Sequence, residues 1–451
     1  MKRVAIGIVA ILFIFSNQAK AVEAPTNAEL FTMVQQLQQT VASQAEQIRH
    51  LHVCHEETCG QLDQYKETIN TLKAKLERDI SGKLKKQLER MQKTGAADLS
   101  IGAGATFIGQ GTSNSNAAGG SAGGTESSRF DAAYSADIEI AKQFGETGLA
   151  FLHLETGDGD TLDGDLALYP RTSVNRDADR SGNAVSLTEV WYDQLLFDSQ
   201  VAITGGKIDP TSYLDTNEFA NDEEAQFLNA MFRNAPTIEF PDNNFGSRIY
   251  YSPKELPGVE MSAMYVQGDG SWEQLFTKPF IGVQVSLKPE KLFNMDEALW
   301  AGNYRAYFWY NGTDHTKFTD TAKTKMANYG FGLSCDQQIT DVFGIFQRIG
   351  WQDQHVGEVQ FHWSLGGQMT GKYWGREQDA MAIAVGQAMP GQPYRDTNPT
   401  HTNQTQIEAY YSFKINDNLT LSPDLQCIWQ PDGSSNDNRI FVYGLRGQID
   451  M

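Results

Sequence analysis

The residues of this chain that are best suited to holding a small polar solute lie in one segment, 209–246. The candidates for solute contact are Tyr213, Asp215, Asn217, Glu218, Asp222 and Glu223. A site for a polyhydroxylated solute needs an aromatic face against C–H surface and polar groups that bond hydroxyls. We also expect Arg233 and Arg248 to pair with the carboxylates of this segment. These residue types predict reversible binding rather than a covalent reaction.

Local signals in the same segment leave a second interpretation open. Asp215, Asn217 and Asn221 can each cap a turn and pin the segment to its surroundings without touching a solute. Asn221, followed three residues later by Glu224, also predicts the start of a short helix. A long ordered connection of this kind is suited to folding inward and narrowing an interior space.

Histidines and cysteines gather near the N-terminal end, where His50, His52 and His55 accompany Cys54 and Cys59. If this segment is a helix packed in parallel with copies of itself, Cys54 of one helix faces Cys59 of its neighbour. An interchain disulfide is then allowed in an oxidising compartment. A metal site on the stripe His52, His55 and Cys59 is the rival interpretation, and unpaired residues at a weakened seam are the third.

Enzymatic chemistry finds little support in the sequence. The run from Gly119 to Gly123 formally matches the nucleophile elbow of hydrolases, but that motif needs a strand-to-helix turn, an acid and a histidine. No Walker loop or credible triad accompanies it. We therefore predict no catalytic residue, no cofactor and no resident metal.

The end of the chain carries the pattern that decides the fold. Residues 441–451 alternate, with Phe441 and Tyr443 on one face and Arg446 and Gln448 on the other. An extended strand places successive side chains on opposite faces. An outer-membrane barrel needs this alternation, because its outer face meets lipid and its inner face meets water. The same pattern recurs throughout 98–451.

Sixteen candidate strands can be placed, an even number as bacterial single-chain barrels require. They are 98–108, 130–142, 147–156, 186–196, 200–208, 247–253, 258–266, 279–287, 301–311, 327–336, 342–352, 357–366, 379–388, 405–414, 418–429 and 438–449. The expected external loops are 109–129, 157–185, 209–246 and 367–378. Arg171, Arg176 and Arg180 are expected in solvent in the second of these loops, and Cys335 and Cys427 are expected to face lipid, unbridged. The predicted fold is all-β, a 16-stranded antiparallel transmembrane β-barrel.

Several stretches of the chain resemble one known family. The stretches 206–209, 215–222, 226–229, 408–413, 417–426 and 444–446 are similar to the carbohydrate-selective porin (OprB) family. The resemblance covers 98–451 and implies a sixteen-stranded outer-membrane pore that passes small solutes, often sugars, without an energy source. The chain departs from the family at its end, where Met451 stands in place of an aromatic residue.

Residues 28–93 differ from the rest of the chain and precede the barrel. They contain no proline, and apolar residues recur at heptad spacing, with Val34 and Val41 at position a and Leu30 and Leu37 at position d. This predicts an α-helical coiled coil, a periplasmic stalk that can reach the cell wall. A single helix cannot bury the seam alone, so the stalk predicts a homo-oligomer. We favour a homotrimer, because porins are commonly trimers.

The N-terminal residues and the net charge of the chain both agree with an outer-membrane protein. Lys2 and Arg3, the apolar run 4–15 and the small-x-small site 19–21 predict a signal peptide over 1–21. The chain carries a net charge of −20, and the excess of acidic residues lies after residue 95. An acidic balance argues against nucleic-acid binding and favours cations near a pore.

The function predicted from these observations is passive diffusion of small hydrophilic solutes, sugars and ions, with carbohydrates the expected class, through a lumen narrowed by 209–246. Two alternatives remain open. One is a structural anchor that links the outer membrane to the cell wall through the coiled coil. The other is a general ion porin with a preference for cations.

The disulfide interpretation predicts a crosslinked species when oxidised membranes are run on a non-reducing gel. Cys54→Ser should remove that species, whereas Cys335→Ser, outside the stalk, should leave it unchanged. A gel that shows only monomer from oxidised membranes would contradict the interpretation.

Overall fold

The computed structural model describes residues 99–113, 128–159, 162, 166–175, 183–296, 300–320, 322, 326–434 and 439–451. The expected signal peptide, the stalk with Cys54 and Cys59, the 119–123 run, and Arg176 and Arg180 lie outside these residues. Within them, no helix has both the length and the apolar character needed to cross a membrane.

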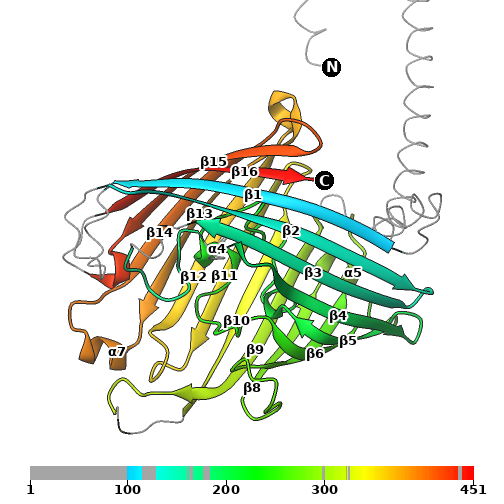
Figure 1. Ribbon diagram of the computed structural model, residues 1–451, viewed down its shortest axis with the longest axis horizontal. Helices are drawn as coiled ribbons and strands as arrows, with labels where there is room; N and C mark the ends of the chain where they lie inside the picture. Colours follow the sequence, from blue (N-terminus) through cyan, green and yellow to red (C-terminus); the bar gives the residue numbers. More distant parts are fainter. Residues whose placement is uncertain are drawn as a thin grey trace, which may run out of the picture. The chain divides into compact units, whose positions relative to one another are not determined.

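The described residues form a closed antiparallel β-barrel in which each strand pairs with its neighbours in sequence and β16 closes the sheet against β1 (Figure 1). The first eight strands are β1 (Leu99–Ser113), β2 (Phe130–Phe144), β3 (Gly148–Gly159), β4 (Ser186–Leu196), β5 (Val201–Ile208), β6 (Asn244–Tyr251), β7 (Val259–Gln267) and β8 (Pro279–Leu287). The others are β9 (Gly302–His315), β10 (Met326–Gln338), β11 (Phe343–Gln352), β12 (Val359–Gly371), β13 (Arg376–Pro390), β14 (Gln404–Lys414), β15 (Leu419–Trp429) and β16 (Ile440–Asp450). The sixteen-stranded barrel confirms the prediction from alternation.

Alternation separates the two faces of the wall as expected. In β16, Tyr443 is 51% exposed on the outer face, whereas Arg446 is 1% exposed on the inner face. Apolar side chains exposed on the outer face include Ile101, Phe107, Ile203, Ile249, Val283, Phe308, Phe331, Leu333, Ile383, Leu425, Phe441 and Leu445. Cys335 and Cys427 lie on this outward parity, half-buried and unbridged, as the sequence predicts. The outer surface is therefore suited to lipid.

One expected external loop, 367–378, is wrong. Strand β12 continues to Gly371 and β13 starts at Arg376, so only the short turn η5 (Lys372–Trp374) joins them. This turn lies at the barrel end that also carries the short joins 145–147, 197–200 and 415–418. The error arose because strand ends that reach beyond the apolar band become polar, and polar residues in sequence suggest a loop.

The 209–243 connection folds into the barrel with little helix. It holds η4 (Pro210–Ser212) and the single-turn α4 (Ala230–Arg233), whereas the helix expected at Asn221 is absent. A turn forms there instead, because the Asp222 carboxylate accepts the Glu224 and Ala225 amides at 2.8 and 3.1 Å. Helix α4 begins later, where the Asn229 side chain accepts the Met231 amide at 3.0 Å. Short helical turns outside this connection are α5 (Pro289–Leu292), α7 (Gln392–Thr397) and η6 (Pro431–Gly433).

Apolar packing inside the barrel holds the inward segments against the wall. One cluster joins Phe227 and Phe232 of the 209–243 connection to Phe346 and Tyr410 of the wall. A second joins Leu214 to Trp309 and other inward residues of neighbouring strands. Each fully buried aromatic or aliphatic side chain contributes about 1.5–3 kcal/mol. Part of the barrel interior is therefore a packed core rather than open water.

The lipid-facing assignment predicts that Phe331→Lys lowers the free energy of unfolding in lipid vesicles by about 2–4 kcal/mol, because a charge then replaces an outward apolar group. The control is Gln378→Lys, which places the same side chain at an exposed strand end. Urea titration of both variants checks this. Equal effects of the two lysines would contradict the assignment of Phe331 to the lipid face.

Candidate functional site

A buried ion pair fixes the first half of the 209–243 connection to the wall. The Asp215 carboxylate and Arg348 of β11 are both 0% exposed, with Arg348 Nε 3.2 Å from Asp215 Oδ2. Arg348 also donates from Nη1 to the Phe232 carbonyl at 2.5 Å and from Nη2 to the Asp215 carbonyl at 2.9 Å. The carboxylate accepts the Ala235 amide at 2.7 Å. Burial raises the pKa of the Asp215 carboxyl, while the Arg348 charge acts in the opposite sense.

A second buried acid fixes the middle of the connection. The two Glu408 oxygens accept the amides of Leu228 and Asn229 at 2.7 and 3.0 Å. Glu408 belongs to β14 and is fully buried. The Asn229 side chain also donates to Gln426 of β15 at 3.0 Å. Since β12 and β13 separate β11 from β14 in the sheet, these two anchors spread the connection along the inner face of this part of the wall.

Asn217 and Glu218 lie against β9 and β10. The Asn217 side chain donates to Ser334 Oγ and the Cys335 carbonyl at 3.3 and 3.2 Å, and accepts the Phe219 amide at 3.1 Å. Asn217 therefore pins the connection, as the second interpretation of the sequence proposed. Burial raises the pKa of the Glu218 carboxyl, and the Asp336 charge adds to this effect.

The predicted pairing of arginines with loop carboxylates holds for one arginine. Arg233 Nη1 lies 2.7 Å from Glu223 Oε2. Arg248 forms no such ion pair in the described residues; its guanidinium carbon lies 4.7 and 4.8 Å from the ring centres of Tyr213 and Tyr250. Burial raises the pKa of Asp222, with the Glu223 charge adding to it.

A second inward segment, 166–175, was not foreseen. Its Tyr169 is 1% exposed, and the Tyr169 hydroxyl donates to the Thr402 carbonyl at 2.8 Å. Arg171, which was expected in solvent, instead donates from Nε to the Pro236 carbonyl of the 209–243 connection at 2.8 Å. The wrong expectation came from treating a polar connection as an external loop. Two glutamines of β14 hold the segment to the wall. The Gln404 side chain donates to the Thr172 hydroxyl at 2.7 Å, and the Gln406 side chain donates to the Thr172 carbonyl at 2.9 Å.

The wall formed by β2–β4 carries acidic and aromatic side chains. His153 Nε2 lies 2.9 Å from Asp137 and its Nδ1 lies 4.0 Å from Glu189. Phe151 and Trp191 stack beside them with ring centres 5.0 Å apart. The sequence alone did not single out these residues as candidates. The signal that could have found them is their alternation, which places them all on the inward faces of neighbouring strands. Carboxylates beside aromatic faces suit polyhydroxylated or cationic solutes.

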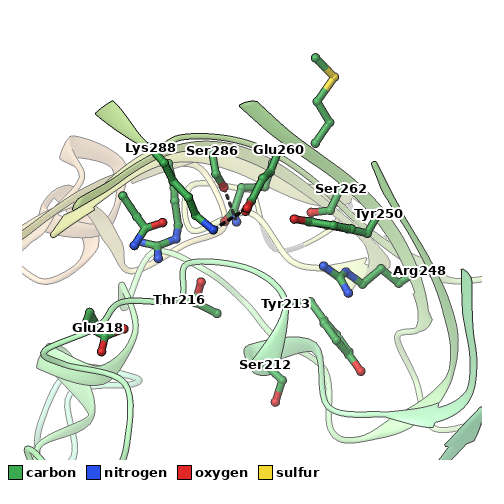
Figure 2. Close-up of a pocket in the computed structure, with 14 residues that line it drawn as sticks. Ser212, Tyr213, Thr216, Glu218, Arg248, Tyr250, Glu260, Ser262, Ser286 and Lys288 are labelled. Carbon is green, nitrogen blue, oxygen red and sulfur yellow. Dashed lines mark hydrogen bonds and ion pairs between the residues drawn. The ribbon is translucent and has the colours of Figure 1, made fainter. Parts of the chain in front are cut away.

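A cavity of about 280 Å³ lies between residues 212–218 and the inner face of β6–β9. Figure 2 shows Arg248 between Tyr213 and Tyr250 on one side of it and the Lys288–Glu260 ion pair on another. Lys288 Nζ lies 2.5 Å from Glu260 Oε1. Four of the lining residues carry serine or threonine hydroxyls, namely Ser212, Thr216, Ser262 and Ser286. Of the candidates, Tyr213, Glu218 and Arg248 line this cavity, whereas Asp215, Asn217, Asp222, Glu223 and Arg233 do not.

A closed barrel with an apolar outer face, a polar inner face and inward segments that narrow its interior defines an outer-membrane porin. The family model described as "Carbohydrate-selective porin, OprB family" matches residues 121–451. The chain belongs to this family of bacterial outer-membrane diffusion channels.

One solved structure shares the fold of this chain, and two more distant proteins are similar to it. The high-pH structure of Pseudomonas putida OprB superimposes with a TM-score of 0.64 at 16% identity, over 83% of this chain and 97% of that chain. A Rhodopseudomonas blastica porin triple mutant gives a TM-score of 0.46 at 10% identity, over 78% of this chain and 100% of that chain. An uncharacterized protein of Aquifex aeolicus (strain VF5) is 24% identical over 229 residues, covering 51% of this chain and 60% of that protein.

The anchoring of the 209–243 connection predicts that Asp215→Ala lowers the free energy of unfolding by about 3–5 kcal/mol, because Arg348 would be left buried and unpaired. Proteases should also cut faster within 216–243. Asp242→Ala, at an exposed aspartate of the same connection, is the matched control for urea titration and limited proteolysis. Identical behaviour of the two variants would show that the ion pair does not hold the connection.

Proposed function

We propose that the protein lets small hydrophilic solutes, sugars foremost, diffuse down their gradients through a lumen narrowed by 209–243 and 166–175. The observation that carries this proposal is the 209–243 connection, held to β11 by Asp215–Arg348 and to β14 by Glu408. A fixed constriction selects by size and surface chemistry without an energy source. The Arg171 bond to Pro236 makes the two inward segments one constriction.

The choice of sugars rests on family membership and on the side chains that face the interior. Phe151, Trp191 and Tyr213 offer ring faces, and the carboxylates and hydroxyls around them accept or donate hydrogen bonds. This mixture matches a sugar, which has C–H faces and a rim of hydroxyls. Reversible contacts of this kind involve no catalytic group and no cofactor, so the function is transport rather than catalysis.

Preference for cations is a second candidate property. Asp137, Glu139 and Glu189 face the interior from β2–β4, and the chain as a whole carries a net charge of −20. A lumen lined by one sign of charge raises the local concentration of the opposite ion. Sugars and cations can therefore share the channel.

The N-terminal part of the chain supports further proposals from sequence alone. The heptads of 28–93 favour a coiled coil in the periplasm, a homotrimer of barrels and contact with the cell wall. The signal at 1–21 agrees with export across the inner membrane. Anchoring through the stalk and diffusion through the barrel are compatible functions.

Planar-bilayer conductance of the purified protein in KCl, with and without glucose, tests the proposed function. We expect steady channels whose current falls when glucose is added. Steady cation-selective channels that ignore sugars would favour the general ion porin. Absence of conductance from folded protein would overturn the diffusion function and leave the anchor as the better account.

A further inference from the structure

Arg248 is a cation without a polar partner at the edge of the cavity under residues 212–218. Among the described residues, no hydrogen bond or ion pair joins its guanidinium to another group, and its Nε is buried without an acceptor. The Tyr213 and Tyr250 rings lie 4.7 and 4.8 Å away. Rings contact an arginine through its flat face, which leaves N–H groups in the guanidinium plane available to another molecule.

The nearby acids do not neutralise Arg248: two of them are committed elsewhere, and Glu218, which also lines the cavity, interacts with Arg305 and Lys288 rather than with Arg248. Glu260 pairs with Lys288 at 2.5 Å. Asp193 accepts the Thr204 hydroxyl at 2.7 Å. The remaining arginine of the cavity, Arg305, pairs with Asp336 at 2.5 Å. One positive charge is thus left open toward the cavity, while the other two are balanced locally.

The cavity around this charge suits one small molecule. Its volume is about 280 Å³. Its lining residues lie at the ends of β6 and β8 and at the starts of β7 and β9. The cavity therefore lies near the barrel end that carries the short turns. The hydroxyls of Thr216 and Ser262 lie at the open space (Figure 2), whereas the Ser212 hydroxyl donates to Asp209 at 3.5 Å. These groups match hydroxyls of a solute, and Arg248 requires an anionic acceptor.

We propose that this cavity binds a monosaccharide that bears a carboxylate, a sugar acid, with Arg248 receiving the carboxylate and the surrounding hydroxyls receiving the sugar hydroxyls. The inference rests on the proposed diffusion function and names a solute class for it. An arginine offers two parallel N–H groups that fit both oxygens of a carboxylate. Tyr213, whose ring contacts the guanidinium, also lines the cavity beside the proposed carboxylate site.

A carboxylate fits this cavity better than a phosphate ester. A phosphate monoester carries about −1.5 to −2 charge at neutral pH. Only one positive charge is open here, and Glu218 and Glu260 also line the cavity. A second negative charge on the solute would face these carboxylates without a partner, whereas a single carboxylate balances Arg248.

The test compares two solutes of the same shape, glucuronate and its neutral amide, glucuronamide. The dissociation constant of each is measured from the reduction of single-channel current in planar bilayers formed with the full-length protein. We expect the wild type to bind glucuronate about tenfold more tightly than glucuronamide. Arg248→Gln should bring the ratio of the two constants close to one. Arg248→Lys keeps the positive charge but loses the two parallel N–H groups of the guanidinium, so it should give an intermediate ratio.

Lys254→Gln provides the matched control, since it removes one positive charge from an exposed side chain that pairs with Asp198 in solvent. It should keep the wild-type ratio. A wild-type channel that binds both solutes equally would overturn the proposal while leaving the diffusion function intact. An equal loss for Arg248→Gln and Lys254→Gln would also overturn it, because a general field would then explain the preference. A channel blocked by neither solute nor glucose would count against the proposed sugar transport itself.

Discussion

Buried charge that pins the 209–243 connection to the barrel wall is the interaction on which the pore depends. Removing a carboxylate and a guanidinium from water is costly unless each finds a partner. Asp215 and Arg348 satisfy that demand together with backbone groups of Ala235 and Phe232. The connection can leave this position only if those charges lose their partners. A chain segment with little helix thereby behaves as part of the wall.

The same anchoring divides the interior into two kinds of surface. Where the inward segments pack, on β9–β16, polar side chains such as Glu408 and Gln426 are used to hold backbone. On β2–β4, Glu189 accepts the Asp209 amide at 3.3 Å, whereas the other inward carboxylates and the Phe151–Trp191 stack line the interior. Solutes therefore meet a wall rich in acids and aromatic rings on one side and a fixed, largely neutralised constriction on the other. Arg248 belongs to neither surface, and within the part of the chain that the structure describes it contacts only the Tyr213 and Tyr250 rings and no acceptor.

Sequence predicted the wall of the barrel better than its contents. Two-residue alternation is a local property, so strands such as β4 and β8 were placed at their observed bounds. Partners across the barrel depend on pairs far apart in sequence, such as Asp215 with Arg348 and Leu228 with Glu408. No local pattern encodes those pairs. For the same reason Arg171 was placed in solvent, and the helix expected at Asn221 gave way to a turn and a later start at Asn229.

Hydrogen exchange of the backbone amides, followed by mass spectrometry of the folded protein in detergent, tests the central claim that the 209–243 connection is a fixed part of the wall. The account predicts that the amides of Leu228, Asn229 and Ala235 exchange as slowly as strand amides, because each donates to a buried carboxylate. Exchange of these amides as fast as that of exposed turns such as 197–200 would contradict it.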